Sequence, residues 1–257
     1  MYLNYIFANG LEVFIDSLQQ VSQVNMREMK TYQPYLSKNT KSMPIHVMPT
    51  EYTLSGKLIS NILTGKQKIE YIATLDEKVL LCMGSVARAM YGHIVSFNSN
   101  HADPVSNTIS LQFMPTFPIA QGEVYEAENL HIAGGTTVAD EDASGGEAVT
   151  LSAYDAYVEI WITQSAYALP LGEYKVFVRA KSTAQIDNDM RLGVWNDTHK
   201  ILRVNEYRTP AANYSLYETG TFTITSDDVG DTLHIYAKKA TSTTNTISID
   251  FIGFVRV

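Results

Sequence analysis

Short runs of alternating apolar and polar residues recur through the second half of the chain, and they constrain the fold more than any other feature. Alternation at every second residue is the period of a half-buried β-strand, because successive side chains on a strand point to opposite faces. Turn residues separate the runs at 134–135, 145–146, 169–172 and 227–230. Such punctuation without a helical period predicts a β-sandwich of the jelly-roll type. The expected strands are Glu123–Glu128, Ala148–Leu151, Tyr157–Thr163, Gly172–Lys181, Arg191–Val194, Tyr217–Ile224, Thr232–Ala237 and Thr246–Val257.

The first half also alternates, but one segment breaks the pattern. Asn9–Gly10, between two apolar runs, is a strong hairpin signal. The segment GKQKIEYIATL places Ile69, Ile72 and Leu75 at helical spacing, and Thr64 is its expected N-cap. We therefore expect strands with a single short helix. The expected strands are Tyr2–Phe7, Glu12–Ile15, Val21–Thr31, Ile45–Val47, Tyr52–Ile59, Lys78–Met83, Ala89–Phe97 and Thr108–Met114.

Residues 32–44 are polar, contain prolines near both ends and show little periodicity, so we expect an exposed loop or arm. Two tyrosines and nearby lysines suit an interface that orders on contact with a neighbouring molecule. A disordered loop is the alternative. The residues concerned are Tyr32, Tyr35, Lys30, Lys38 and Lys41.

Charge is unevenly distributed between the two halves of the chain. The formal net charge is −8, but residues 1–119 carry nine Lys and Arg against eight Asp and Glu, whereas residues 120–257 carry ten against nineteen. Eight of the nine methionines also fall in the first part. Two prolines and a glycine interrupt the chain at 114–122, where the composition changes. We therefore expect two domains, residues 1–119 and residues 123–257.

Composition excludes several classes of function. The excess of acidic residues leaves no basic footprint for nucleic acid, and no apolar run is long enough to span a membrane. The segment MYLNYIFANGLEV lacks a basic region and a small-residue cleavage site, so we expect no cleaved signal peptide. Cys82 is the single cysteine, which excludes internal disulfides and cysteine-based zinc sites. Its apolar neighbours predict a buried thiol.

The motifs of the common enzyme classes are absent from the sequence. It contains neither G-x-S-x-G, a phosphate-binding loop, G-x-G-x-x-G nor H-E-x-x-H, and its six histidines are scattered singly. Asp140, Glu141 and Asp142 are adjacent, which is typical of a solvated acidic turn and not of two carboxylates facing each other across a cleft. We therefore expect a protein that is not an enzyme.

The stretch from Tyr52 to Phe117 contains, in order, TLSGKLI, IEYIATL, KVLLCMG, MYGHIVSFNSN and ISLQFMP, followed by a proline-containing exit. In its order of strands and helix, this stretch resembles the N-terminal ring-forming domain of siphophage distal tail proteins. The resemblance implies a split β-barrel related to the tail-tube fold, with subunits assembled in a ring. An unrelated small β-barrel with one helix is the alternative.

Four segments follow in order: VYEAENLHIAGG, DASGGEAVTL, ALPLGEYKVFVRAKS and TISIDFIGFVRV. In this layout the second half resembles a carbohydrate-binding module of the galactose-binding-like jelly-roll class. The resemblance implies a structural calcium ion held by Glu126, Glu128 and Asp250. Residues two apart on a strand share a face, and a cation offsets the repulsion between neighbouring carboxylates. A solvent-facing Glu and an Asp250 that caps a turn are the alternative.

The same resemblance places a sugar site in loops at one end of the sandwich, where an aromatic platform lies beside amide and acid groups. Aromatic rings stack on the C–H face of a pyranose, while Asn and Asp hydrogen-bond its hydroxyls. Trp161 lies inside an alternating apolar run and is expected in the core, and core packing is also the alternative for Trp195. Such sandwiches also serve as adhesion or structural modules. The candidate residues are Trp195, Asn196, Asp197, Tyr207 and Tyr214.

Together the two resemblances imply a distal tail protein that is mainly β, with a tail-tube-like split barrel containing one short helix, followed by a jelly-roll sandwich. Distal tail proteins form a ring, commonly a hexamer, that joins the tail tube to the baseplate hub at the tip of a phage tail. The implied location is the virion, after assembly in a host cytoplasm, and the implied partner of the sandwich is a host-surface glycan. Two alternatives stay open: a tail-tube subunit with a decorating sandwich, and a stand-alone secreted carbohydrate-binding protein.

Overall fold

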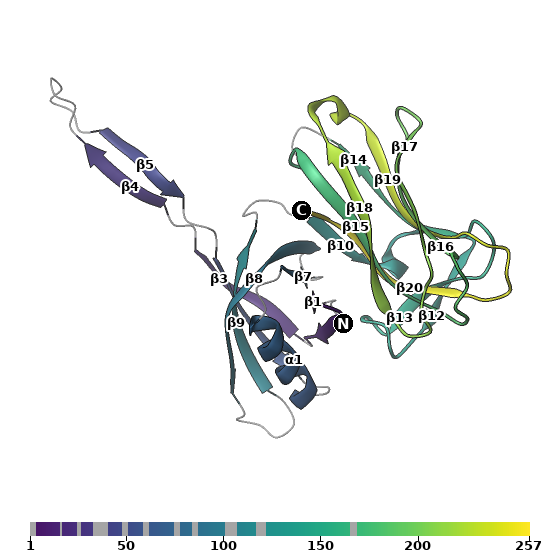
Figure 1. Ribbon diagram of the computed structural model, residues 1–257, viewed down its shortest axis with the longest axis horizontal. Coiled ribbons are helices and arrows are strands. Elements are labelled where there is room, and N and C mark those ends of the chain that lie inside the picture. The colour runs from purple at the N-terminus through teal and green to yellow at the C-terminus, as the bar shows by residue number, and fades with distance from the viewer. Residues whose placement is uncertain are drawn as a thin grey trace. The chain divides into compact units, whose positions relative to one another are not determined.

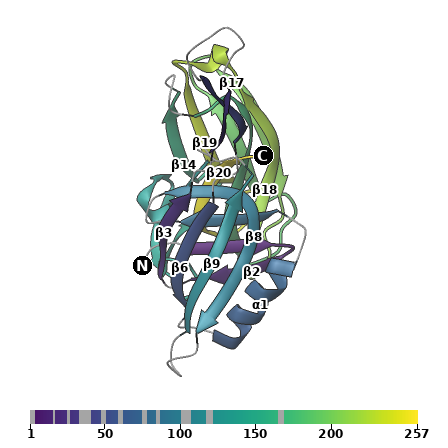
Figure 2. The same cartoon turned by 90° about the vertical axis from the view of Figure 1, so that its left-hand side faces the viewer.

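The protein is mainly β, with one α-helix in the part of the chain that the structure describes, which confirms the predicted fold class. Figures 1 and 2 show the computed structural model from two sides. Within its described residues, no helix combines the length and the apolar character needed to cross a membrane. The described residues are 4–15, 17–24, 27–32, 41–47, 51–58, 62–74, 78–83, 87–100, 107–116, 122–164 and 169–257.

The chain divides into two compact units that interleave along the sequence. The first comprises Met1–Ile6, Leu80–Tyr91 and Ala120–Val257, and the second comprises Phe7–Val79 and Gly92–Ile119. The predicted division into two consecutive domains, with a boundary near residue 120, stays a prediction. Residues 117–121 at this boundary lie outside the described part of the chain.

Seven strands of the first half form one sheet in the order β2-β1-β7-β8-β9-β6-β3, which does not close into a barrel among the described residues. Strands β4 and β5 pair with each other in a separate antiparallel ribbon (Figure 1). The elements are β1 (Asn4–Ala8), β2 (Leu11–Phe14), β3 (Ser17–Val24), β4 (Arg27–Tyr32), β5 (Lys41–Val47), β6 (Glu51–Leu58), α1 (Ile62–Thr74), β7 (Val79–Met83), β8 (Arg88–Asn100) and β9 (Asn107–Pro115).

Local sequence accounts for several of these elements. The turn between β1 and β2 has positive φ at Asn9 (48°) and Gly10 (73°), as a two-residue type I′ hairpin turn requires. Ile69 and Ile72 are buried, as predicted, where α1 packs on β2 and β6 (Figure 2). The helix begins at Ile62, so Thr64 lies inside it and the predicted N-cap is wrong. Cys82 is fully buried, as predicted, and burial raises the pKa of its thiol.

Two predictions about the region before β6 need correction. The single strand expected at Val21–Thr31 corresponds to parts of two strands, since β3 pairs with β6 whereas β4 pairs with β5. The loop expected at 32–44 is partly strand, since pairing with β4 satisfies the backbone of β5 from Lys41 onward. Its middle, residues 33–40, lies outside the described part of the chain.

The second half forms a sandwich of two antiparallel sheets. One sheet has the order β12-β13-β20-β15-β18, with β10 also paired to β20, and the other has the order β11-β14-β19-β16-β17. The elements are β10 (Gly122–Glu126), the 3-10 turn η2 (Ala127–Asn129), β11 (His131–Ala133), β12 (Gly135–Ala139), β13 (Glu147–Leu151), β14 (Tyr157–Thr163), β15 (Gly172–Ser182), β16 (Met190–Asn196), β17 (Ile201–Arg208), β18 (Ser215–Ile224), the 3-10 turn η3 (Ser226–Asp228), β19 (Thr232–Lys239) and β20 (Ile247–Arg256).

Side chains from both sheets interdigitate in the sandwich core, including the fully buried Val176, Val194, Ile235 and Ile249. Each such side chain stabilises the fold by about 1.5–3 kcal/mol. The sequence pattern missed β11, β12 and β17. Strand β17 has a single buried residue, Val204, so its sequence shows little of the apolar alternation that marks a half-buried strand.

Candidate functional site

The five-stranded sheet of the sandwich packs one face against the core and leaves the other face outside. Along β14, Val158 and Ile160 are buried in the core, so the residues that alternate with them lie on the outer face. Strand β19 alternates in the same way, with every second side chain buried. We call this outer surface the aromatic face.

Strand pairing aligns the outward residues of the aromatic face in three rows. The first row contains Trp161, His234, Trp195 and Leu202. The second row contains His131, Glu159, Tyr236, Gly193 and Asn205. The third row contains Ala133, Tyr157, Lys238, Arg191 and Tyr207. A cavity of about 290 Å³ opens among eight of these residues: Tyr157, Glu159, Arg191, Trp195, Leu202, His234, Tyr236 and Lys238.

Trp161 stands at one edge of this surface. Trp161 is 60% exposed, and its indole ring stacks on the imidazole of His234 with ring centroids 4.7 Å apart. His131 meets the same indole edge-on at 5.6 Å. The prediction that Trp161 lies in the core is wrong, because its position along β14 has the parity of Glu159 and not of Ile160. A supported and exposed indole is the kind of group that stacks on the apolar face of a sugar ring.

Glu159 holds the two imidazoles beside Trp161. Its side chain is 7% exposed, and its carboxylate oxygens lie 2.8 Å from Nδ1 of His131 and 3.2 Å from Nδ1 of His234. A carboxylate only accepts hydrogen bonds, so each Nδ1 donates. The two bonds fix the planes of both imidazole rings and, through His234, support the stacked position of Trp161.

Tyr236 occupies the centre of the aromatic face because its neighbour on β16 is a glycine. A Cβ atom at Gly193 would lie 2.3 Å from the phenol oxygen of Tyr236, so only glycine leaves room for this ring. Burial raises the pKa of the Tyr236 phenol, which keeps its O–H as a hydrogen-bond donor. The side chains of Arg191 and Lys238 lie over the ring at 5.7 Å and 5.9 Å from its centroid.

The structure places two of the five residues predicted for sugar binding on the aromatic face. Trp195 is half-buried in the first row, and its Nε1 donates to Asp197 Oδ1 at 3.2 Å. Asp197 follows β16 directly and also accepts a hydrogen bond from Lys200 at 2.8 Å. Tyr207 is 44% exposed and lies opposite Arg191 in the third row.

Two of the three remaining predicted sugar-binding residues, Asn196 and Tyr214, lie elsewhere. Asn196 is fully buried, because β16 extends to it and alternation turns it inward, where its amide donates to Asp231 Oδ2 at 2.6 Å. Tyr214 precedes β18 of the other sheet and donates its hydroxyl to Asp140 at 2.8 Å. Its ring lies under two cations, Arg179 and Lys181.

Sequence reasoning missed most of the aromatic face. The omitted residues are His131, Tyr157, Glu159, Trp161, Arg191, His234, Tyr236 and Lys238. The alternation along β14 and β19 could have identified the residues on these two strands. Both strands were predicted, and many of their outward side chains are aromatic or charged. The sheet order that brings these strands beside β16 is not visible in the pattern.

The three residues predicted to hold calcium do lie near one another. Asp250 is fully buried, and its Oδ1 accepts the backbone N–H of Ser144 at 2.9 Å while its Oδ2 accepts Arg179 Nη1 at 2.5 Å. The hydroxyl of Ser144 lies 2.7 Å from Asp250 Oδ1 and 2.8 Å from Glu126 Oε2. One carboxylate oxygen of Glu126 and one of Glu128 are buried without a hydrogen-bond partner.

Of the three carboxylates, those of Glu126 and Glu128 fit a hard cation such as Ca²⁺. A Cβ at Gly145 would lie 3.2 Å from Glu128 Oε1 and 3.6 Å from Glu126 Oε1, so glycine leaves space beside both carboxylates. Burial raises the pKa of Glu126 to about 7 and also raises the pKa of Glu128, as expected of carboxylates that lack a counter-ion. Asp250 instead faces Arg179. No group of three acidic, histidine or cysteine side chains converges as a metal site among the described residues.

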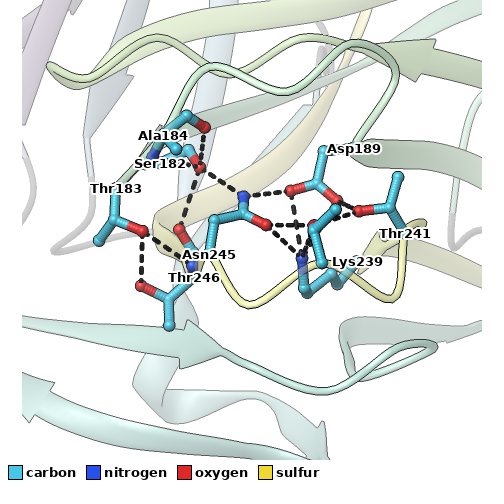
Figure 3. Close-up of polar contacts among 9 residues, drawn as sticks. Ser182, Thr183, Ala184, Asp189, Lys239, Thr241, Asn245 and Thr246 are labelled. Atoms are coloured by element: carbon cyan, nitrogen blue, oxygen red, sulfur yellow. Dashed lines mark hydrogen bonds and ion pairs between the residues drawn. The ribbon is translucent and has the colours of Figure 1, made fainter.

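A second polar cluster, shown in Figure 3, lies where β19 ends and the loop before β20 begins. Lys239 is fully buried, and its Nζ donates to both oxygens of Asp189 at 3.1 Å and 3.2 Å and to Asn245 Oδ1 at 2.9 Å. Asn245 Nδ2 in turn donates to Ser182 Oγ at 2.9 Å and to Asp189. Burial favours the neutral Asp189, but hydrogen bonds from Thr241, Asn245 and Lys239 outweigh it and lower its pKa. The cluster joins two loops to the end of β15.

Comparison with known proteins found no family model that matches the sequence and no curated protein that matches it. Several solved structures are similar in part. A carbohydrate-binding module (CBM6cm-2) from Cellvibrio mixtus lichenase 5A, in complex with cellotriose, is 13% identical over 52% of this chain and 96% of that chain, with a TM-score of 0.38. A carbohydrate-binding module, CBM36, in complex with calcium and xylotriose, is 20% identical over 51% of this chain and 98% of that chain, with a TM-score of 0.37. The SPP1 Dit (gp 19.1) protein, a hub protein of the adsorption apparatus in phages, is 10% identical over 97% of this chain and 99% of that chain, with a TM-score of 0.33.

Proposed function

We propose that this protein is a non-catalytic glycan-binding protein whose aromatic face holds the sugar. The observation that carries the proposal is the exposed indole of Trp161, which stacks on His234. His234 and Trp195 line the cavity beside it. The indole supplies a flat apolar surface, and Glu159 holds its imidazole support in place. Polar groups at the rim of the cavity supply the hydrogen bonds that a sugar requires.

Glycan-array screening of the full chain, followed by calorimetry on the best ligand, tests this proposal. Trp161→Ala removes the stacking surface and should weaken binding about thirtyfold, the loss that follows from removing one dominant contact of about 2 kcal/mol. Tyr71→Ala is the matched control, because Tyr71 is an aromatic residue that is 50% exposed on α1, an element that forms no part of the aromatic face. A blank array, or equal affinity of the Trp161 variant and the parent, would refute glycan binding at the aromatic face.

We further propose that the protein works at the tip of a phage tail, as a ring that presents the sandwich outward. The order of strands and helix in the first half supports this role, since it resembles that of ring-forming distal tail domains. Negative-stain imaging of the purified full chain tests it. Rings are expected, long tubes would favour a tail-tube subunit, and monodisperse monomers would favour a stand-alone binding protein.

We propose that Glu126 and Glu128 hold Ca²⁺ through their unpartnered oxygens, while Asp250 stays paired with Arg179 and adds negative charge nearby. Oxygen ligands with two carboxylates suit this ion. A bound Ca²⁺ would stabilise the sandwich by offsetting the repulsion between these two half-buried carboxylates.

A further inference from the structure

We propose that the glycan bound by the aromatic face is acidic, and that Arg191 and Lys238 recognise its oxyanion. This inference rests on the proposed glycan binding and adds the class of sugar. Arg191 on β16 and Lys238 on β19 are direct partners across the two strands, and both line the cavity. Their side chains lie over the same Tyr236 ring, so the two cations meet at one end of the cavity.

The placement of two cations directly opposite each other costs stability, because like charges at such positions repel. Two adjacent cations are also unexpected in residues 120–257, which carry nineteen acidic and only ten basic side chains. The acidic groups nearby do not neutralise the pair fully. Glu159 accepts hydrogen bonds from two histidines, and Asp155, which lies 2.9 Å from Lys238 Nζ, has a side chain that is 55% exposed and therefore forms only a weak surface ion pair.

Arg191 is positioned to present its guanidinium to a ligand. Its Nε donates to Asn205 Oδ1, which fixes the plane of the group, and among the described residues its two Nη atoms have no hydrogen-bond acceptor. The free edge of a fixed guanidinium matches two oxygens of a carboxylate or a phosphate. Lys238 adds a second positive charge beside it.

The aromatic and basic parts of the face therefore contact different parts of one ligand. Trp161 and Trp195 lie in the first row and offer surfaces for stacking, whereas Arg191 and Lys238 lie in the third row between Tyr157 and Tyr207. A neutral sugar would stack on the aromatic residues of the first row but would offer no oxyanion to Arg191 or Lys238. A uronic acid or a sugar phosphate satisfies both rows, and these two sources of an oxyanion share the same chemistry.

The test uses the full chain and an array on which each neutral oligosaccharide is printed beside its C6-carboxylated and C6-phosphorylated counterparts. We expect at least one acidic counterpart to bind about tenfold more tightly than its neutral form, since hydrogen bonds to charged groups exceed the 1.4 kcal/mol that corresponds to tenfold. Arg191→Gln and Lys238→Gln should each remove this preference, so that the acidic and the neutral form bind with similar affinity. The preference should also weaken as salt rises.

Lys200→Gln is the charge-matched control, because Lys200 lies in the turn after β16, has a side chain that is 67% exposed and does not line the cavity. It should leave the preference unchanged. Arg191→Lys keeps the charge but loses the planar fork, so a partial loss is expected. Equal binding of neutral and acidic forms by the parent would overturn the acidic-glycan inference and leave glycan binding intact. A preference that survives in both cavity variants would also overturn it, whereas an array blank for every form would overturn the proposed function itself.

Discussion

Replacing the buried lysine of the second polar cluster should destabilise the sandwich strongly. Lys239→Met keeps the length of the side chain and removes its charge, which leaves the carboxylate of Asp189 buried with neutral donors only. Removing one partner of a buried ion pair typically costs 3–5 kcal/mol. Hydrogen bonds from Thr241 and Asn245 remain, so we expect a loss near the lower limit, about 3 kcal/mol. At 2–4 °C per kcal/mol, the fall in Tm is about 6–12 °C.

Tryptophan fluorescence during urea unfolding measures this loss in the intact chain. The protein has two tryptophans, Trp161 and Trp195, and both lie in the sandwich, so their emission reports on this half alone. The double variant Lys239→Met with Asp189→Leu should recover much of the loss, because an apolar pair of similar volume often replaces a buried ion pair at little cost.

The pH dependence of the same variant gives a second check. Because folding lowers the pKa of Asp189 from 3.8, its ion pair contributes fully above that pH, and the contribution disappears as the pH falls through the folded pKa. The difference between parent and Lys239→Met should therefore shrink in acid. A loss below about 1 kcal/mol at neutral pH would refute the reasoning, as would a double variant that is no more stable than the single one.

Four further predictions concern the sandwich. Chelator should lower Tm at neutral pH, by an amount that corresponds to about 2.7 kcal/mol at a hundredfold excess of Ca²⁺ over Kd, and the double variant of Glu126→Gln and Glu128→Gln should be insensitive to it. In chelator, folding raises the pKa of Glu126 from 4.5 to about 7, so the folded state binds the extra proton and stability should fall as the pH rises through this window; a flat profile of Tm against pH would contradict the shift. Gly193→Ala should displace the ring of Tyr236 and cost about 1–3 kcal/mol in urea unfolding, and normal stability would show that the ring moves freely. Glu159→Leu should loosen the stacked indole, shift tryptophan emission and weaken glycan affinity, and unchanged emission with unchanged affinity would contradict the role of its carboxylate.

Local pattern in the sequence was sufficient to predict many of the strands and the helix. The predicted strand Tyr157–Thr163 coincides with β14, and the buried positions of α1 appear at the spacing that predicted a helix. These predictions succeed because burial repeats with the period of the element itself, every second residue on a strand and every three or four on a helix. Strands such as β17, which bury little, leave no such trace.

The aromatic face was decided by tertiary structure, since it depends on which strands pair and in which register. Residues 131, 159, 195 and 234 come from four strands that only the sheet order makes neighbours. The same long-range pairing brings Arg179 beside Asp250 and Asp189 beside Lys239, because a buried charge requires a partner. Alternation along β16 and β14, by contrast, turns Asn196 inward and leaves Trp161 exposed, against expectations drawn from their immediate neighbours. Periodicity specifies the face on which a side chain lies, whereas its neighbours on that face are set by contacts between segments distant in sequence.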